Sequence, residues 1–479
     1  MQGIASRFDR QWPLACLVLA LASLRLCHVH LLWADEDYHI AAAINLLHGR
    51  VPYRDFWYDK PPLSAAYYLL IGGYSGWPLR LLDVAYVYIA CWLIFRLAQA
   101  FWTKAEGWTA ALLLAFFTTF YLPSAVIPFA ADALMLAPHL AAVYCARKRF
   151  AMAAGVWCGI AFLVNTKAVF VLATCAVWMF PDLMFLFLGF ALPAAVALTC
   201  ALITGAWSGY CEQVWRWGFI YAEQSPVTRP FLNGLVRTAD WLGFHAALAA
   251  GAIFGFGRLT GSDRLKLGVW VVFSFAAVAI GWRFAPHYFL QVLPALIVVA
   301  SRGIVLAVSR HRRFASAVLA LLLLAPFIRF GPRYALLAWD NIRGQEPQWI
   351  DVVMDLDSQQ ASKEIRALQR PGDTMFVWGY RPDIYVYTRM TSDSRFWDSQ
   401  PLTGVPADRH LHASVAIYGG PAAANRDELT RSHPIFLVDG LSLLNPGLAP
   451  NLYPELRPWL TRYKLVSRTK LSLIYRRIE

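Results

Sequence analysis

The sequence predicts an α-helical membrane protein that crosses the bilayer many times and ends in a small soluble α/β domain. Of its 479 residues, 58% are hydrophobic and only 15% are charged, with a mean hydropathy of +0.45, whereas soluble domains carry about a quarter charged residues. Apolar runs long enough to span a bilayer recur as far as residue 330. From residue 331 the composition is that of a soluble protein, so we expect a membrane domain at 1–330 and an α/β domain at 331–479.

Eleven apolar segments have the length and composition expected of bilayer-spanning helices. They lie at about 12–32, 79–100, 107–122, 131–146, 151–165, 168–181, 183–205, 241–257, 267–282, 288–308 and 314–330. The first follows Arg7 and Arg10, as a signal peptide would, but it is long for one and no small-x-small cleavage site precedes Asp35. We therefore expect an uncleaved first helix.

Short basic clusters between the apolar segments predict the orientation. With the N-terminus in the cytoplasm, the clusters at 96–104, 147–149, 258–266 and 302–313 all face the cytoplasm, as the positive-inside bias requires. These clusters also account for much of the net charge of +13 without a nucleic-acid partner. The first loop and the whole C-terminal domain are then extracytoplasmic.

The first outer loop, 33–78, has apolar positions at helical spacing over 38–48 and again over 63–71. We expect two amphipathic helices on the membrane surface, with Trp33 and Trp57 at headgroup depth. Further outer segments are a short Pro123 to Pro128 connection, turns at 165–167 and 283–288, and a Trp-rich loop at about 206–240. The aromatic residues of that loop either form an interfacial belt or line a lipid-tail groove: Trp207, Trp215, Trp217 and Tyr221.

The C-terminal region alternates helices and strands, which favours an α/β layer domain. We expect helices at 350–368, 383–388 and 425–430, strands at 374–378 and 435–438, and a hairpin at 463–476. Its aspartates Asp373, Asp383 and Asp393 form no recognisable site, and the domain is interpreted as a lid or acceptor-recognition module. All eight cysteines precede residue 212 without metal-ligand spacing and are interpreted as core residues.

Two charged motifs lie in the first outer loop. Asp35, Glu36 and Asp37 directly follow the first apolar segment, where ionisable groups are costly and indicate function. The alternative is an acidic patch at a helix N-terminus; an Asp-x-Asp nucleotide–metal motif would need a preceding nucleotide-binding domain. About twenty residues later, Asp59 and Lys60 precede two prolines that rigidify the turn, and a lysine held this way presents a cation to a phosphate.

The order Asp-Glu-x-Tyr, helix, Asp-Lys-Pro-Pro-Leu resembles the GT-C glycosyltransferases that use polyprenyl-phosphate sugars, near the lipid A aminoarabinose transferases and protein O-mannosyltransferase-like enzymes. The resemblance covers about 12–330. It implies inverting transfer from a lipid-phosphate sugar donor to a glycan, lipid or protein acceptor, outside a bacterial cytoplasmic membrane. It also implies that Asp35 is the catalytic base and that Asp59 and Lys60 lie near the donor phosphate. Because the aminoarabinose enzymes tend to have glutamate where Asp59 stands, a divalent metal at Asp35 and Asp59 stays open.

Other predicted substrate contacts come from the same outer face. Lys167 and Arg283 are candidates for phosphate, and a lysine and an arginine at these turns also match the resemblance. Several candidates also have a structural alternative. Lys167 would snorkel to the interface, His287 would form structural hydrogen bonds, Arg80 would contact lipid headgroups, and Tyr58 would belong to the interfacial belt.

The predicted site consists of these candidates, Arg283, Glu36 and the motif residues Asp35, Asp59 and Lys60. We expect positions 35, 60 and 283 to share one pocket.

Two other function classes remain. A transporter or flippase of lipid-linked sugars would place ionisable groups near mid-membrane, commonly within inverted repeats, whereas here the acids gather at one outer rim and no repeat is found. A polytopic hydrolase or polysaccharide polymerase acting on the same lipids is the third. The sequence has neither a Walker-type loop nor a Gly-x-Gly-x-x-Gly turn after a strand, so nucleotide chemistry is not expected.

Overall fold

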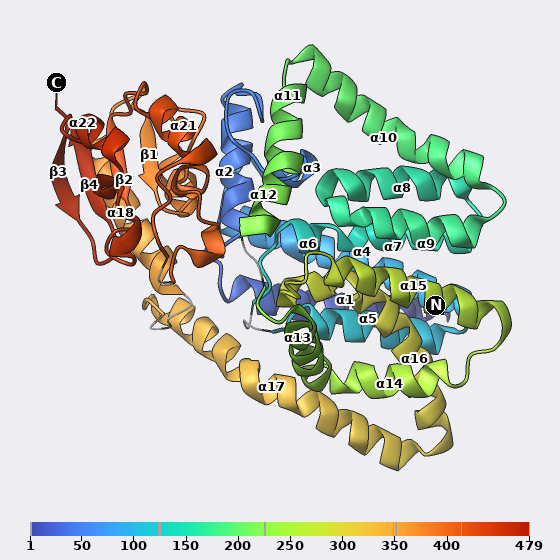
Figure 1. Ribbon diagram of the computed structural model, residues 1–479. Helices are drawn as coiled ribbons and strands as arrows, with labels where there is room; N and C mark the ends of the chain where they lie inside the picture. Colours follow the sequence, from blue (N-terminus) through green and yellow to red (C-terminus); the bar gives the residue numbers. More distant parts are fainter. Residues whose placement is uncertain are drawn as a thin grey trace. The chain divides into compact units, whose positions relative to one another are not determined.

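The computed structural model describes residues 2–122, 126–224, 227–347, 349, 352–412 and 414–478. The chain is mostly helical, with a small sheet near the C-terminus (Figure 1). It forms two compact units. The helical unit comprises Met1–Val29, Trp77–Ala197 and Val227–Gln345, and the mixed unit comprises His30–Gly76, Leu198–Pro226 and Glu346–Glu479.

These units do not coincide with the ranges predicted from composition. Residues 330 and 331 both lie inside one helix, α17 (Arg312–Arg343). The first outer loop, predicted as part of the membrane domain, folds together with the C-terminal residues in the mixed unit. Composition separates apolar from polar segments, but it carries no information about which distant polar segments pack together.

All eleven predicted spans are helical over most of their length. The helices that begin in the helical unit are α1 Gln2–Leu26, α4 Trp77–Phe101, α5 Lys104–Phe117, α6 Ala131–Leu134, α7 Leu136–Arg147, α8 Ala151–Val164, α9 Val169–Met179, α10 Leu183–Ile203, α13 Pro230–Phe244, α14 Ala246–Phe256, α15 Gly261–Ala279, α16 Leu293–Arg310 and α17, with 3-10 turns η2 Thr166–Ala168 and η4 Pro286–Gln291. The predicted connection from Pro123 to Pro128 falls partly outside the described residues.

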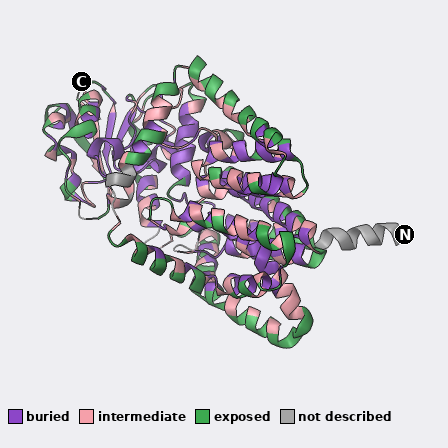
Figure 2. Cartoon of the chain, turned by 45° about the vertical axis from the view of Figure 1, so that its right-hand side comes forward, coloured by how far each residue is buried: buried purple, intermediate pink, exposed green. Residues whose placement is uncertain are grey.

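Within the part of the chain that is described, four helices are long and apolar enough to cross a membrane: α4, α10, α16 and α17. A fifth span results if α13 and α14, which meet at a bend of 93°, are one broken span. In α10 and α17 only 11% of the most apolar stretch is buried, so their outer faces are apolar and exposed (Figure 2). The number of eleven spans stays a prediction.

Small residues allow some helices of this unit to pack backbone to backbone. A Cβ added at Gly303 of α16 would collide with the carbonyl oxygen of Gly251 in α14, and one at Gly155 of α8 would collide with the carbonyl oxygen of Leu186 in α10. Such close approach is a common way for membrane helices to gain packing energy without a hydrophobic driving force.

The mixed unit contains a four-stranded sheet. Its strands are β1 Met375–Trp378, β2 Phe436–Asp439, β3 Tyr463–Arg468 and β4 Leu473–Arg477, in the order β1-β2-β4-β3 (Figure 1). The β1–β2 pair is parallel and the other pairs are antiparallel. The sheet is accompanied by α18 Val353–Leu368, α19 Asp383–Thr388, α20 Gln400–Thr403, α21 Gly420–Leu429 and α22 Arg457–Leu460, with short 3-10 turns η6 Ala407–Arg409, η7 Pro446–Leu448, η8 Pro450–Leu452 and η9 Pro454–Leu456. The elements predicted for this region are confirmed, although residues 350 and 351 of the first helix lie outside the described residues.

The first outer loop and residues 198–226 complete the mixed unit. They form α2 Glu36–Leu47, α3 Leu63–Ala66, η1 Tyr67–Ile71, α11 Trp207–Tyr210, the π-helix η3 Cys211–Arg216 and α12 Trp217–Gln224. Within the predicted loop, residues 207–224 and 230–240 are therefore helical. The side chain of Tyr221 lies outside the described residues.

The first predicted surface helix is different in the structure. Every residue of α2 from Glu36 to Asn45 is buried, because α2 packs against α19 of the C-terminal region. Trp57 is also buried and packs edge-on to Trp217, with ring centroids 5.6 Å apart. The helix at 38–48 is thus an interior element, and Trp33 and Trp57 are core residues of this unit.

Candidate functional site

Asp35 occupies the N-cap position of α2 in an unusual backbone conformation. Its φ of 76° and ψ of −36° lie where non-glycine residues are rare and strained. Its side chain does not cap the helix, and among the described residues its carboxylate has no hydrogen-bond partner, while the residue is exposed. Backbone strain at a residue whose carboxylate does not stabilise the helix is typical of functional sites.

The two acids that follow Asp35 are buried and hydrogen-bonded. The carboxylate of Glu36 accepts a hydrogen bond of 2.8 Å from the Trp33 N–H, which closes the turn before α2. Asp37 accepts from the Tyr38 N–H at 2.7 Å. Burial, together with the charges of Asp383, Asp35 and Glu36, raises the pKa of Asp37 well above its usual value. Of the three acids, Asp35 alone faces water.

The second motif is held against α2. Lys60 and Asp59 form an ion pair of 2.9 Å, in which the Lys60 side chain is 42% exposed and that of Asp59 is 11% exposed. The Asp59 N–H donates to the Tyr38 hydroxyl oxygen at 3.3 Å, and the Tyr53 hydroxyl donates to the Lys60 carbonyl at 2.7 Å. The turn with its partly exposed cation is therefore tied directly to α2, the helix that Asp35 precedes.

A side chain from the π-helix η3 fixes the same turn. Gln213 is fully buried; it accepts from the Tyr58 N–H at 2.8 Å and donates to the Tyr53 carbonyl at 2.7 Å. π-Helical turns are rare and frequently occur at functional sites. Sequence reasoning missed Gln213, because its partners lie about 155 residues earlier in the chain.

Tyr58 lies in the interior of the mixed unit and not in an interfacial belt. It has no exposed surface, it stacks on Tyr38 with ring centroids 5.4 Å apart, and its hydroxyl lies 2.6 Å from Nδ1 of His39. Burial lowers the pKa of His39 to about 3, with a smaller contribution from Lys60, so this imidazole is neutral. Tyr58 thus supports the motif from behind.

The C-terminal region adds aromatic and acidic groups that the sequence analysis did not identify. Tyr38 stacks against Tyr380, at 5.6 Å, and against Trp397, at 4.9 Å between ring centroids. Asp398 is buried and accepts from the Gln400 N–H at 2.8 Å. Burial, with the charge of Asp59, raises the pKa of Asp398 to about 7. For Tyr380 the available signal was its place directly after the buried strand β1, at the strand end where α/β proteins place ligands.

Three buried aspartates of the mixed unit each lie in the first turn of a helix: Asp37 in α2, Asp355 in α18 and Asp383 in α19. Asp355 accepts hydrogen bonds from the Tyr387 hydroxyl at 2.6 Å and the Gln359 amide at 2.8 Å. Burial, with the charge of Asp383, raises the pKa of Asp355 to about 7, and burial also raises that of Asp383. Asp383 is close enough to Asp37 for its charge to raise the pKa of that carboxyl.

The helical unit holds the other predicted contacts. Nζ of Lys167 lies 2.8 Å from the centroid of the Tyr288 ring. Asp132, which the sequence analysis did not single out, accepts from Asn165 at 2.9 Å and from Gln291 at 3.2 Å, and its second oxygen lies 3.8 Å from Nε2 of His287. Asp132 therefore ties the turn that carries Lys167 to the one that carries His287.

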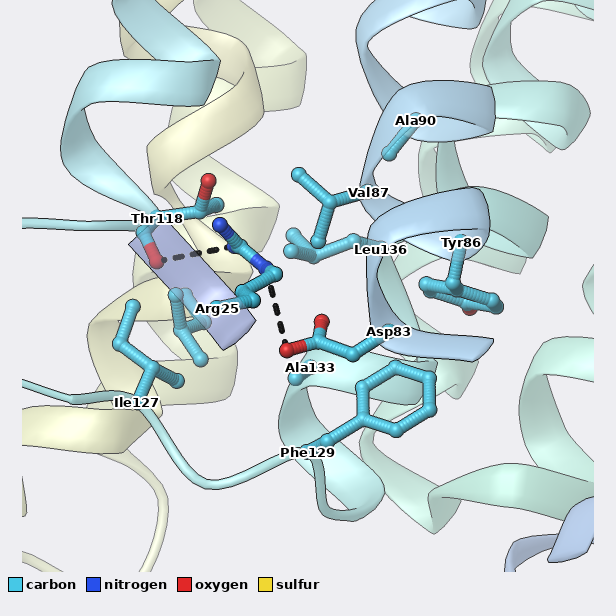
Figure 3. A pocket seen from close by; sticks show the side chains of 11 residues that line it. Arg25, Asp83, Tyr86, Val87, Ala90, Thr118, Ile127, Phe129, Ala133 and Leu136 are labelled. Atoms are coloured by element: carbon cyan, nitrogen blue, oxygen red, sulfur yellow. Dashed lines mark hydrogen bonds and ion pairs between the residues drawn. The ribbon is translucent and has the colours of Figure 1, made fainter. Parts of the chain in front are cut away.

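Arg283 and Arg80 have different environments in this unit. Arg283 is half-buried between Trp282 and Phe284, whose φ values of 60° and 46° are left-handed. Arg80 is 1% exposed on α4, which removes it from contact with lipid headgroups. One turn later, Asp83 forms a buried ion pair of 3.0 Å with Arg25 beside a small cavity (Figure 3).

The described residues do not contain a set of ligands for the divalent metal ion considered in the sequence analysis. None of their histidine, cysteine, aspartate or glutamate side chains form a group of three or more that could hold an ion. The Asp59 carboxylate is instead engaged by the Lys60 ammonium, which competes with a cation for the same oxygen. The residues present therefore do not fit a conventional metal site, and we derive no chemical step through a metal.

Comparison with protein-family models gives no match to this chain, and comparison with curated proteins gives none either. Solved structures do match. ArnT from Cupriavidus metallidurans aligns in its apo state with a TM-score of 0.59 at 14% identity, and bound to undecaprenyl phosphate with a TM-score of 0.59 at 12% identity; both alignments cover 98% of each chain. The oligosaccharyltransferase of Archaeoglobus fulgidus, in complex with Zn and sulfate, aligns with a TM-score of 0.51 at 14% identity, over 97% of this chain and 73% of that one.

At such low identity these alignments establish the architecture and leave the activity to be argued from the residues. They extend over nearly the whole chain and include the C-terminal region, which the sequence resemblance did not cover. The prediction from the two motifs is thereby confirmed at the level of the fold: this chain shares the fold of ArnT and of the Archaeoglobus fulgidus oligosaccharyltransferase.

Proposed function

We propose that the protein is an inverting glycosyltransferase that moves a sugar from a polyprenyl-phosphate carrier to an acceptor hydroxyl, on the outer face of a bacterial cytoplasmic membrane. One observation carries the proposal. The mixed unit contains an exposed carboxylate with a strained backbone, Asp35, and a half-exposed cation, Lys60. They belong to one cluster, because Tyr38 of the helix after Asp35 accepts a hydrogen bond from the N–H of Asp59, the ion-pair partner of Lys60. The fold shared with ArnT, which has been solved with undecaprenyl phosphate bound, supports the lipid-phosphate donor.

The chemistry needs a base and a cation. Asp35 accepts the proton of the acceptor hydroxyl while that oxygen forms a bond to the anomeric carbon of the sugar. The bond from the anomeric carbon to the phosphate oxygen breaks on the opposite face, and its electron pair leaves with the polyprenyl phosphate. Lys60 neutralises the charge that develops on that phosphate. A single displacement of this kind inverts the anomeric configuration.

The remaining predicted contacts lie in the other unit and stay proposals. Lys167 and Arg283 are proposed to bind the donor phosphate, and His287 to support them. Arg80, being buried, is proposed to act only through its neighbours.

The experiment is a donor assay with purified full-length protein. Polyprenyl-phosphate mannose, arabinose and aminoarabinose, each radiolabelled in the sugar, are compared with the matching nucleotide sugars. We expect consumption of at least one lipid-phosphate donor, no consumption of nucleotide sugars, and a product of inverted anomeric configuration by NMR. Turnover of nucleotide sugars alone, or retention of configuration, would rule out the proposal.

A further inference from the structure

The environment of Tyr380 differs from that of the other tyrosines in this cluster. Tyr38, Tyr53 and Tyr58 are buried, whereas Tyr380 is partly exposed. Its ring lies on Tyr38, and its hydroxyl has no hydrogen-bond partner among the residues that the structure describes. A partly exposed polar side chain that stacks on the helix directly after Asp35 is available to bind a substrate.

The backbone on both sides holds Tyr380 in place. Gly379, with a φ of 134°, turns the chain sharply at the end of β1, in a region that other residues rarely adopt. Arg381, on the other side, is 2% exposed and donates to Ser358 at 2.9 Å and to Asp357 at 3.2 Å. An anchored neighbour and an obligatory turn give the preorganisation that substrate-binding groups require.

The surroundings of the Tyr380 hydroxyl are acidic. After burial, the charges of Asp35, Asp59, Asp37 and Asp398 raise the pKa of Tyr380 well above its usual value, with Asp35 contributing most among them. The phenol is therefore a neutral hydrogen-bond donor at physiological pH, and it lies within electrostatic reach of Asp35. Since the charges of Asp35 and Asp59 act on it, an anionic group is disfavoured at this position and an uncharged hydroxyl is not.

We propose that Tyr380 contacts the acceptor and, with Asp35, forms a subsite for an uncharged, hydroxyl-rich molecule such as a sugar or polyol. This inference rests on the glycosyltransferase function proposed above. Asp35 takes the proton of the reacting hydroxyl, and the Tyr380 hydroxyl donates a hydrogen bond to a neighbouring oxygen of the same acceptor. The C-terminal region thereby contributes directly to acceptor choice, and the transfer step itself is unchanged.

A partition experiment tests this without knowledge of the natural acceptor. The protein consumes its labelled donor in aqueous glycerol, and the ratio of glycosyl-glycerol to free sugar is measured, with water as the competing acceptor. In each product the donor loses its lipid phosphate, and the acceptor loses one proton to Asp35. Because both products come from the same active molecules, the ratio does not depend on how much protein is correctly folded.

We expect the wild-type protein to transfer sugar to glycerol more often than the mole fraction of glycerol in the solvent would give. We expect Tyr380→Phe to lower the ratio of glycosyl-glycerol to free sugar about fivefold, which corresponds to the loss of one neutral hydrogen bond. Phenylalanine keeps the ring that lies on Tyr38. Tyr418→Phe, the same change at a tyrosine that is 53% exposed elsewhere in the mixed unit, serves as the matched control and leaves the ratio unchanged. Glycerol 3-phosphate, offered in place of glycerol, is captured less well than glycerol.

Three results overturn the inference while the proposed function stands: wild type that gives glycerol no preference, Tyr380→Phe with the wild-type ratio, or preferential capture of glycerol 3-phosphate. If wild type consumes no lipid-phosphate donor at all, the proposed function fails, and this inference fails with it. Donor consumption is measured in the same samples, so the two kinds of failure are distinguished.

Discussion

Asp35 and Lys60 differ from the charged residues around them in being accessible. Glu36 and Asp37 use their carboxylates within the protein, and Asp59 is mostly covered by its ion pair. An exposed carboxylate and an exposed ammonium anchored to the same helix can act on a substrate, whereas buried partners only hold them in position. The division of roles at the residue scale therefore follows from burial.

Replacing Lys60 with glutamine removes the cation while retaining most of the side chain's volume. We expect the donor KM to rise about tenfold or more, because a charge-assisted contact with phosphate is lost. Lys60→Arg restores most of the affinity. Lys470→Gln, at an exposed lysine of the same unit, is the control, and an unchanged donor KM in Lys60→Gln would remove this residue from the phosphate site.

Asp355 predicts a pH dependence of stability. Its pKa of about 7 in the folded protein exceeds the ordinary value of 3.8, so the folded state holds a proton that the unfolded state releases. The contribution of this group to the free energy of unfolding is therefore greatest below about pH 4. It falls by about 4 kcal/mol as the pH rises toward 7 and levels off above that. The free energy of unfolding, measured between pH 4 and 8, should fall less steeply in Asp355→Asn than in wild type, with Asp427→Asn as the control. Equal slopes in wild type and Asp355→Asn would show that the carboxyl is ionised in the folded protein.

Candidate residues could be proposed from the sequence more readily than their surroundings. The order of the two motifs proposed Asp35, Asp59 and Lys60, because residue types at a membrane boundary carry chemical meaning even without coordinates. Burial could not be predicted from the sequence. Glu36 was therefore expected to contact the substrate, and Tyr58 was expected either to contact the substrate or to belong to the interfacial aromatic belt. Tyr380 was missed because its place depends on a contact between residues more than 340 positions apart.

At the scale of elements, the turn of the second motif depends on side chains from other segments. Gln213 of η3 satisfies one donor and one acceptor of the turn's backbone, and Trp397 donates to the Trp57 carbonyl at 2.6 Å. The proline pair alone therefore does not fix the turn. Its position relative to α2 comes from a helix and a C-terminal segment that follow much later in the chain.

Gln213→Ala leaves the Tyr58 N–H and the Tyr53 carbonyl buried without partners. We expect a loss of about 2–4 kcal/mol in the free energy of unfolding, because each unsatisfied buried group costs about 1–3 kcal/mol. Gln360→Ala, at an exposed glutamine of α18, should change stability by less than about 0.5 kcal/mol. Denaturant unfolding of both variants, followed by tryptophan fluorescence, makes the comparison, and equal stabilities would show that the turn does not need Gln213.

The elements predicted in the C-terminal region are present, since its buried strands are short apolar runs with a clear local pattern. The helix at 38–48 was predicted, but its surroundings were not. Its polar positions were assigned to water, whereas His39 and Asn45 are buried and hydrogen-bonded to Tyr58 and to the Ala41 carbonyl. Periodicity reports which positions are apolar, and it cannot distinguish water from a polar protein neighbour.

At the scale of the whole molecule, the chain combines apolar helices that are long enough to cross a membrane with a unit that holds the predicted base and one predicted cation. The alignment with ArnT extends over 98% of both chains, so the architecture is shared even where the sequence is not. The function proposed for that architecture depends on Asp35 acting as a base, a role that the fold alone does not establish.

The most direct test is the rate at which Asp35→Asn releases polyprenyl phosphate from saturating labelled donor, measured beside Asp427→Asn, the same change at an exposed aspartate of α21. Asparagine keeps the shape of the side chain but cannot accept the proton, so the account predicts a rate at least about a hundredfold below that of the control, with donor binding retained. A rate in Asp35→Asn equal to that of the control would contradict it.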